Sequence, residues 1–172
     1  MKKQLLVIAT LDTKGREAAY VRDSAAERGV HPVLMDIGVL GVPQTRPDIA
    51  NRELAEAAGH DLEDLIKARD RAKALEAIQE GGSLVSRRLL EEGRLDGVIG
   101  LGGGTGTAMV SYIMRSLPFG LPKVIVSTVA SRDVRNSLPP RTSSCSIPSR
   151  TFSASTNLFA LSSVRPPTRY AA

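Results

Sequence analysis

A glycine-rich stretch between a short apolar run and an amphipathic helical pattern constrains the fold of this chain most strongly. It reads Ile99-Gly-Leu-Gly-Gly-Gly-Thr-Gly-Thr107 and follows Gly97-Val98. Glycines at a strand-to-helix junction let the backbone approach a ligand, and the free N–H groups of the helix start can point at an anion. We therefore expect a phosphate-binding turn in an α/β domain. The alternative is a tight turn that only packs the helix on the sheet.

Apolar runs of strand length alternate with helical patterns along residues 1–136, which predicts an α/β fold with a Rossmann-like parallel sheet. The expected strands are 5–9, 32–37, 97–99 and 123–127; the expected helices are 17–28, 49–92 with a break at Gly81-Gly82, and 107–117. Asp12 or Thr13 is expected to cap the first helix, and Asp61 a later one. Ligands of such sheets bind beyond the carboxyl ends of the strands. The loops at 10–15, 100–107 and 128–131 should therefore share one rim.

The charge of the chain is unevenly distributed. Residues 1–136 hold 19 Lys and Arg against 18 Asp and Glu, so this part carries only +1, whereas residues 137–172 carry four arginines and no acid. With aromatic residues at 3% of the chain, a nucleic-acid-binding surface is not expected. No apolar run is long enough for a membrane span. A single cysteine, Cys145, fits a reducing, cytoplasmic compartment.

The composition changes after Asn136. Ser, Thr and Pro make up half of residues 137–172, which predicts an irregular or disordered tail outside a domain at 1–136. Read one nucleotide out of register, residues 142–156 can encode an apolar, β-like run. We interpret 137–172 as an off-frame segment, and we expect the last strand of the sheet to be missing there.

Four segments resemble the ATP-binding domain of the tomato mosaic virus resistance protein-like family. They read ATLDTKG, DIGVLGVPQTRPDI, LDGVIGLGGGTGTA and MRSLPFGLPKVIVSTVAS, and the resemblance covers residues 5–133 in the same order. It implies ATP as the ligand, two small Rossmann-like subdomains, and a second large domain that this chain lacks. Two departures are Arg132, where the family usually has glycine, and the glycine stretch, where the family pattern is closer to GGSGGT.

The stretch fits neither G-x-G-x-x-G nor the P-loop pattern, because position 105 is threonine and no lysine follows. Lys14 is the expected charged phosphate contact, and Asp12 is expected to orient it, to hold a Mg²⁺-bound water or only to cap the helix. Asp36 ends the second strand, where an acid can face a ribose. The predicted ligand-binding residues are Thr10, Asp12, Thr13, Lys14, Gly15, Asp36, Gly102, Gly103, Gly104, Thr105, Gly106, Thr107, Ser127 and Thr128.

No catalytic or metal-binding set is predicted, since His31 and His60 lie far apart and no Ser/His/Asp combination converges. Three functions stay open: a nucleotide-binding module, a fragment of a phosphoryl-transfer or hydrolytic enzyme, and a protein-interaction or inhibitor domain that ATP stabilises. The expected partners are a nucleotide, with or without Mg²⁺, and the missing C-terminal domain. Self-association into a homo-oligomer is left open, and neither nucleic acid nor a membrane is expected.

Overall fold

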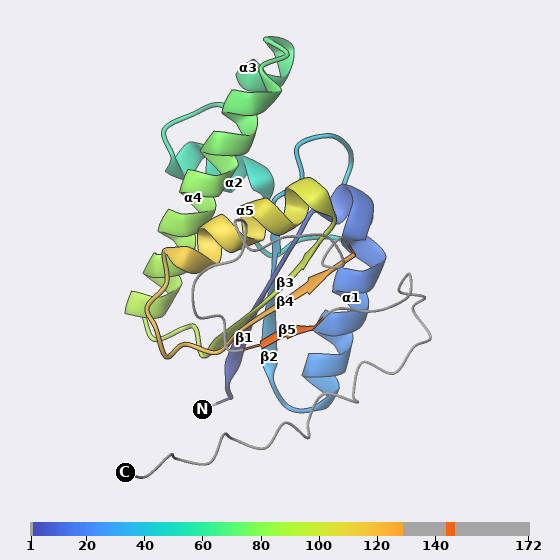
Figure 1. The fold of residues 1–172 in the computed structure, drawn as a ribbon, viewed down its shortest axis with the longest axis vertical. Helices are drawn as coiled ribbons and strands as arrows, with labels where there is room; N and C mark the ends of the chain where they lie inside the picture. The colour runs from blue at the N-terminus through green and yellow to red at the C-terminus, as the bar shows by residue number, and fades with distance from the viewer. Residues whose placement is uncertain (1, 129–143, 147–172) are drawn as a thin grey trace, which may run out of the picture.

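A parallel β-sheet forms the centre of the fold (Figure 1). In a computed structural model, which describes residues 2–128 and 144–146, the strands are β1 (Gln4–Ala9), β2 (His31–Asp36), β3 (Gly97–Gly102), β4 (Lys123–Ser127) and β5 (Ser144–Ser146). Their order is β2-β1-β3-β4-β5, and all neighbours are parallel. This confirms the predicted α/β class. The order reverses between β1 and β3, so this is the topological switch point of the sheet.

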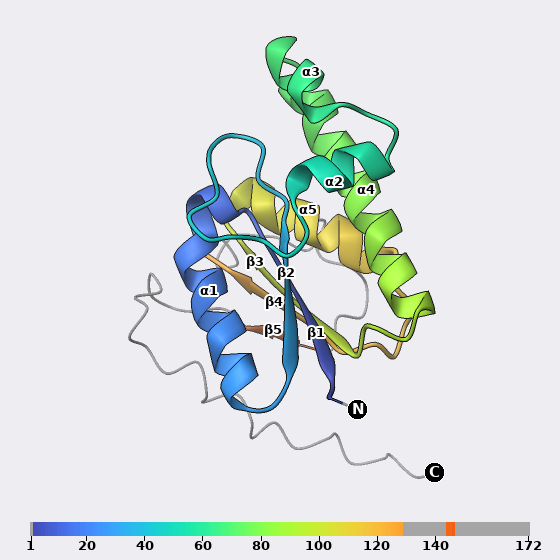
Figure 2. The ribbon, with the colours of Figure 1, turned by 180° about the vertical axis from the view of Figure 1, so that it is seen from behind.

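Helices cover both faces of the sheet. They are α1 (Leu11–Glu27), α2 (Asn51–Ala57), α3 (Leu62–Lys67), α4 (Arg71–Glu91) and α5 (Gly104–Arg115). Figures 1 and 2 show α1 on one face and α4 with α5 on the other, while α3 and the start of α4 extend beyond the carboxyl ends of the strands. Every described strand belongs to one sheet, and the expected division into two small subdomains stays a prediction.

The side chains of β1 alternate between two hydrophobic cores. Leu6 and Ile8 belong to the larger core, which α2, α4 and α5 complete. Val7 and Ala9 face the smaller core, where they meet Ala18 of α1. All four side chains are at most 1% exposed, as expected for a strand buried on both faces. This explains why the sequence shows a continuous apolar run here rather than an alternating one.

The predicted break at Gly81-Gly82 is wrong, because α4 continues through both glycines. A Cβ on Gly81 would overlap the carbonyl oxygen of Leu54 in α2, and a Cβ on Gly82 would lie 2.6 Å from Cδ1 of Ile113 in α5. Each glycine lowers helix stability by about 1 kcal/mol relative to alanine. Here the glycines let three helices pack closely, which offsets that loss.

The predicted loop at 10–15 is also mostly helical. The first helix begins at Leu11, with non-helical angles at Lys14 (φ −123°, ψ 17°), and the N-cap position falls on Thr10 without a side-chain capping bond. The prediction that Asp12 or Thr13 caps this helix is therefore wrong. Asp61 does cap its helix, since its carboxylate accepts hydrogen bonds from the N–H groups of Glu63 and Asp64.

One part of the predicted irregular tail is a strand. Ser144–Ser146 forms β5 and pairs with β4 from Val124 to Val126, so the expectation that no strand follows β4 is wrong at these three residues. The rest of the tail, together with Ser131 and Arg132, lies outside the described residues.

Among the helices of the described ranges, none is both long and apolar enough to cross a membrane.

Candidate functional site

A cavity of about 180 Å³ lies at the switch point of the sheet, beyond the carboxyl ends of β1 and β3. Four segments form it: the start of α1, the loop after β2, the start of α5 and the start of α4. Its lining includes Thr10, Asp12, Thr13, Ile37, Val39, Leu40, Arg71, Leu75, Gly103, Gly104, Thr105, Gly106 and Met109. The structure thus brings together seven of the residues predicted to bind a ligand. Open α/β sheets bind their ligands at this position.

The glycines of the stretch have two different roles in the structure. Gly100 and Gly102 lie in β3 under α5, where a Cβ on Gly102 would lie 2.6 Å from the carbonyl carbon of Gly106. In contrast, a Cβ on Gly104 would meet nothing within 4 Å, and one on Gly103 would meet only Thr128 Oγ1 at 3.9 Å. The packing interpretation therefore explains the first glycines but not the later ones, which line the cavity.

The N-terminus of α5 points its backbone N–H groups at this region. Gly103 is the N-cap residue and makes no side-chain capping bond, while the N–H of Thr107 already donates to the Gly103 carbonyl at 2.9 Å. The N–H groups of the first helical residues, from Gly104 onward, have no acceptor within a helix. They carry the positive end of the helix dipole. This end of α5 can therefore accept an anion.

Arg71, the first residue of α4, supplies a cation to the cavity. Among the described residues, its guanidinium forms no hydrogen bond or ion pair, and the residue is exposed. Arg71 was not predicted from the sequence, because it lies about 30 residues from the glycine stretch and in no motif. The one available signal was the cap at Asp70, which accepts from the N–H of Lys73 and fixes where α4 begins.

Lys14, the predicted phosphate contact, does not line the cavity. Its Nζ lies 2.8 Å from Oε1 of Glu17, and both side chains are largely buried. The non-helical backbone of Lys14 accompanies this inward position. Arg71 is therefore the cation that the fold places at the cavity, and Lys14 stabilises the first turns of α1.

Other predicted residues support the site from behind or lie beside it. Gly15 is buried against Gln44, and Gly102 lies under α5. The hydroxyls of Thr107 and Ser127 are 2.7 Å apart and buried, so they join α5 to β4. Thr128 is exposed at the end of β4, where its N–H donates to the Gly102 carbonyl. None of these five lines the cavity.

Asp36 is buried directly behind the cavity and does not reach it. Its Oδ1 accepts hydrogen bonds from the N–H groups of Leu11 at 3.0 Å and Gly38 at 2.8 Å. Burial raises the pKa of Asp36 above its ordinary value of 3.8, although these two bonds oppose the shift and the neighbouring Asp12 adds to it. The predicted ribose contact is thus instead a residue that joins α1 to the loop after β2.

Replacing Asp36 with asparagine is expected to raise the free energy of unfolding at neutral pH. The amide oxygen can accept the same two hydrogen bonds, and no buried charge remains. Because the folded-state pKa of Asp36 is raised, its ionisation destabilises the fold as the pH rises from about 3.8 through that raised pKa. The advantage of D36N should therefore shrink as the pH falls toward 3.8. Urea unfolding of both proteins at a series of pH values measures this difference.

Asp48→Asn provides the matched control. Asp48 also accepts a backbone hydrogen bond, from the N–H of Leu34 at 2.8 Å, but it is exposed. It should show no comparable gain at neutral pH. A gain for D36N that is the same at every pH would contradict the role of Asp36 ionisation.

Asp12 is the carboxylate that lines the cavity. Its Oδ1 is buried and has no hydrogen-bond partner within the described residues. The lack of a side chain at Gly38 leaves room for it, since a Cβ there would lie 3.0 Å from Asp12 Oδ1 and 3.1 Å from Asp36 Oδ1. A carboxylate that lines the same cavity as an anion-accepting helix end fits Mg²⁺, which proteins hold by one or two carboxylates together with substrate phosphates. No set of three metal-ligating side chains occurs in the described ranges.

Comparison with known proteins places the chain in a family. Residues 3–141 match the N-terminal domain of the uncharacterised protein family UPF0261. A UPF0261 protein of Clostridium tetani is 42% identical over 135 residues, which cover 78% of this chain and 33% of that protein. A UPF0261 protein of Brucella suis is 38% identical over 137 residues, which cover 80% of this chain and 32% of that protein. The chain thus spans about a third of the length of these relatives.

A shorter match connects the chain to a plant protein. The ToMV resistance protein Tm-1(GCR237) of Solanum lycopersicum is 63% identical over 41 residues, or 24% of this chain and 5% of that protein. The resemblance drawn from the sequence motifs is therefore confirmed only in part: the plant match covers a short segment, whereas UPF0261 proteins of bacteria match along most of the chain. The chain belongs to the uncharacterised protein family UPF0261, whose N-terminal domain it carries in residues 3–141.

Proposed function

We propose that this domain binds a nucleotide, with ATP as the expected ligand, and holds its phosphates at the N-terminus of α5. The observation that carries the proposal is the cavity at the β1/β3 switch point, where Gly103–Gly106 and Arg71 meet. The helix end offers several N–H donors with a partial positive charge, and Arg71 adds a full charge with a planar set of donors. These groups suit phosphate oxygens.

The Mg²⁺ that accompanies ATP would be held by Asp12. When bound, the ion would neutralise phosphate charge next to this carboxylate. The N–H groups of α5 and the guanidinium of Arg71 would bind the phosphate oxygens. Thr10 and Thr13, whose hydroxyls lie 2.8 Å apart, line the same cavity and would lie close to the same anion.

An enzymatic role remains the alternative within this proposal. Phosphoryl transfer or hydrolysis needs a group that positions or activates the attacking nucleophile. Asp12 is the one carboxylate on the cavity wall among the described residues, so Asp12→Asn tests this role through phosphate release. In the other alternative, an interaction domain, ATP would stabilise the fold without turnover.

The test is a thermal-unfolding titration of the full chain with Mg-ATP, with inorganic tripolyphosphate as a second ligand. A ligand that binds only the folded state stabilises it by about 2.7 kcal/mol at 100 times its Kd, so the transition midpoint should rise visibly. Arg71→Ala should weaken both ligands about tenfold or more, because it removes a charge-assisted contact to phosphate.

Arg87→Ala is the matched control. Arg87 is exposed on the same helix but does not line the cavity, so the affinities of this variant should equal those of the native chain. A cooperative transition that neither ligand moves would refute the proposed function. Binding that R71A and R87A weaken equally would move the phosphate site away from this cavity.

A further inference from the structure

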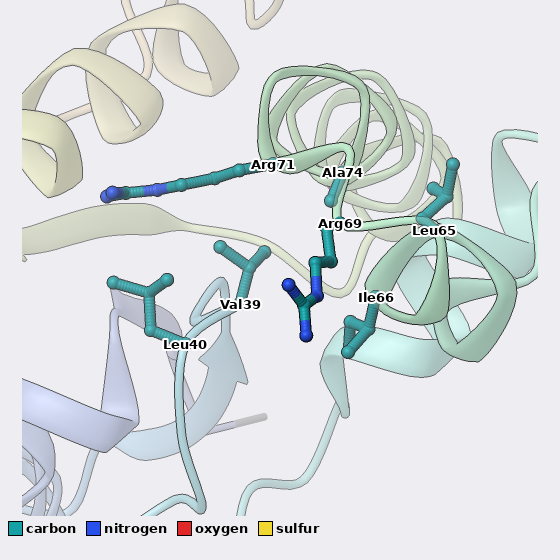
Figure 3. A pocket seen from close by; sticks show the side chains of 7 residues that line it. All are labelled: Val39, Leu40, Leu65, Ile66, Arg69, Arg71 and Ala74. Atoms are coloured by element: carbon teal, nitrogen blue, oxygen red, sulfur yellow. The ribbon is translucent and has the colours of Figure 1, made fainter.

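A second cavity, of about 230 Å³, adjoins the first (Figure 3). It lies between the loop after β2 and the turn that joins α3 to α4. Val39, Leu40 and Arg71 line both cavities, so the two adjoin at these side chains. The rest of the second cavity is mostly aliphatic, with Leu65 and Ile66 on α3. A ligand bound at α5 can therefore extend into it.

Arg69 lines this cavity and has an unusual backbone conformation. Its φ of 55° is in the left-handed region, and it is the one described residue other than glycine found there. It follows the C-cap of α3, where the N–H of Arg69 donates to Ile66 and that of Asp70 to Leu65. Glycine is the usual residue at such a position. In this chain Gly29, Gly59 and Gly93 adopt the same positive φ directly after other helices. A side chain is thus retained at a site that favours glycine.

The side chain of Arg69 also lacks a structural partner. Figure 3 shows its guanidinium reaching between Val39 and Ile66. It forms no hydrogen bond or ion pair with any residue in the described ranges. Residues held in sparsely populated backbone regions cluster at functional sites, so this position is a candidate for ligand contact. The planar guanidinium lies among aliphatic side chains in a cavity of about 230 Å³.

We propose that this second cavity holds the base of the nucleotide, with the guanidinium of Arg69 stacked on the face of the ring. The inference rests on the proposed function and extends it from the phosphates to the base. A guanidinium is planar and stacks on aromatic rings, and the aliphatic side chains cover the remaining ring surface. Arg71, which both cavities share, lies where the phosphates join the nucleoside.

The experiment compares ATP with tripolyphosphate, which lacks a base, on the native chain and on Arg69→Gly and Arg69→Lys. Arg69→Gly relieves the backbone strain, so its unfolding midpoint should rise, and loss of ATP binding cannot then come from misfolding. We expect R69G to bind ATP about tenfold more weakly and tripolyphosphate as tightly as before. Arg69→Lys keeps the charge without the planar group and should behave like R69G toward ATP.

The outcomes separate this inference from the proposed function. If the native chain binds neither ligand, the proposed function fails and the base site with it. If it binds both equally, or if R69G leaves the ratio of the two affinities unchanged, phosphate binding stands and the base site is refuted. If R69K binds ATP as tightly as the native chain does, the second cavity holds a second anionic group, and stacking is refuted.

Discussion

Replacing Thr105 with aspartate is expected to weaken the binding of ATP and tripolyphosphate at least 100-fold, and to leave the fold intact. Thr105 is the second residue of α5, is exposed, and lines the cavity. A carboxylate there would compete with phosphate for the N–H groups of the helix start. Two unit charges 4 Å apart near a protein surface interact by roughly 4 kcal/mol, which is more than the 2.7 kcal/mol of a 100-fold loss.

The same substitution is expected to stabilise the folded domain slightly. An acid in the first turn of a helix gains about 0.3–1 kcal/mol from the helix dipole, and α5 has no acidic residue in its first turn. Binding and stability should thus change in opposite directions. Isothermal titration calorimetry and urea unfolding of one protein preparation measure both.

Thr105→Asn is the control, because it has the size of aspartate without its charge. It should retain most of the affinity. Equal losses for T105D and T105N would show that the shape of the cavity rather than its charge governs binding. Unchanged affinity in T105D would place the anion elsewhere.

Replacing Gly81 with alanine is expected to lower the free energy of unfolding by about 2–3 kcal/mol, as overpacking of a tight interface does. A Cβ on this residue would overlap the Leu54 carbonyl oxygen, and it would lie 3.0 Å from the Leu54 Cα. The obstacle is backbone, so no side-chain rotation can relieve it, and α2 must move away from α4. The gain in helix propensity, about 1 kcal/mol, is smaller than this loss.

Gly104→Ala is the matched control, since it is also a helical glycine but its Cβ would meet nothing within 4 Å. Because the added Cβ meets no obstacle, the free energy of unfolding should not fall, and helix propensity should raise it by up to about 1 kcal/mol. Urea unfolding followed by circular dichroism measures both variants. If G81A were as stable as G104A, the close contact between α2 and α4 would not exist in solution.

Local patterns in the sequence were sufficient to predict the strands β1 to β4 and their parallel arrangement. The apolar runs that became β1, β2 and β4 are continuous because those strands are covered on both faces, and this continuity is visible without any tertiary knowledge. The parallel arrangement in turn predicted that the loops after the strands lie at one edge of the sheet. The order of the strands, and with it the switch point between β1 and β3, depends on long-range pairing that no local pattern contains.

The errors have a common physical origin. Gly81-Gly82 was predicted to break a helix because glycine is a poor helix former, yet tertiary contacts with Leu54 and Ile113 override propensity. Lys14 was predicted to bind phosphate because it lies in the first βα segment, yet its ammonium group forms an ion pair with Glu17 instead of lining the cavity. Arg71 was missed because it reaches the cavity from a helix that starts far from it in sequence.

The close contact at Gly81 determines more than the stability of two helices. Arg71 begins α4 ten residues before Gly81, so about 15 Å of helix separates the charge from the contact. At the glycine pair, α4 is in close contact with both α2 and α5. If α4 tilted slightly at this contact, its first residue, Arg71, would move away from the N-terminus of α5. The close packing at Gly81 and Gly82 is therefore expected to help fix the position of that charge.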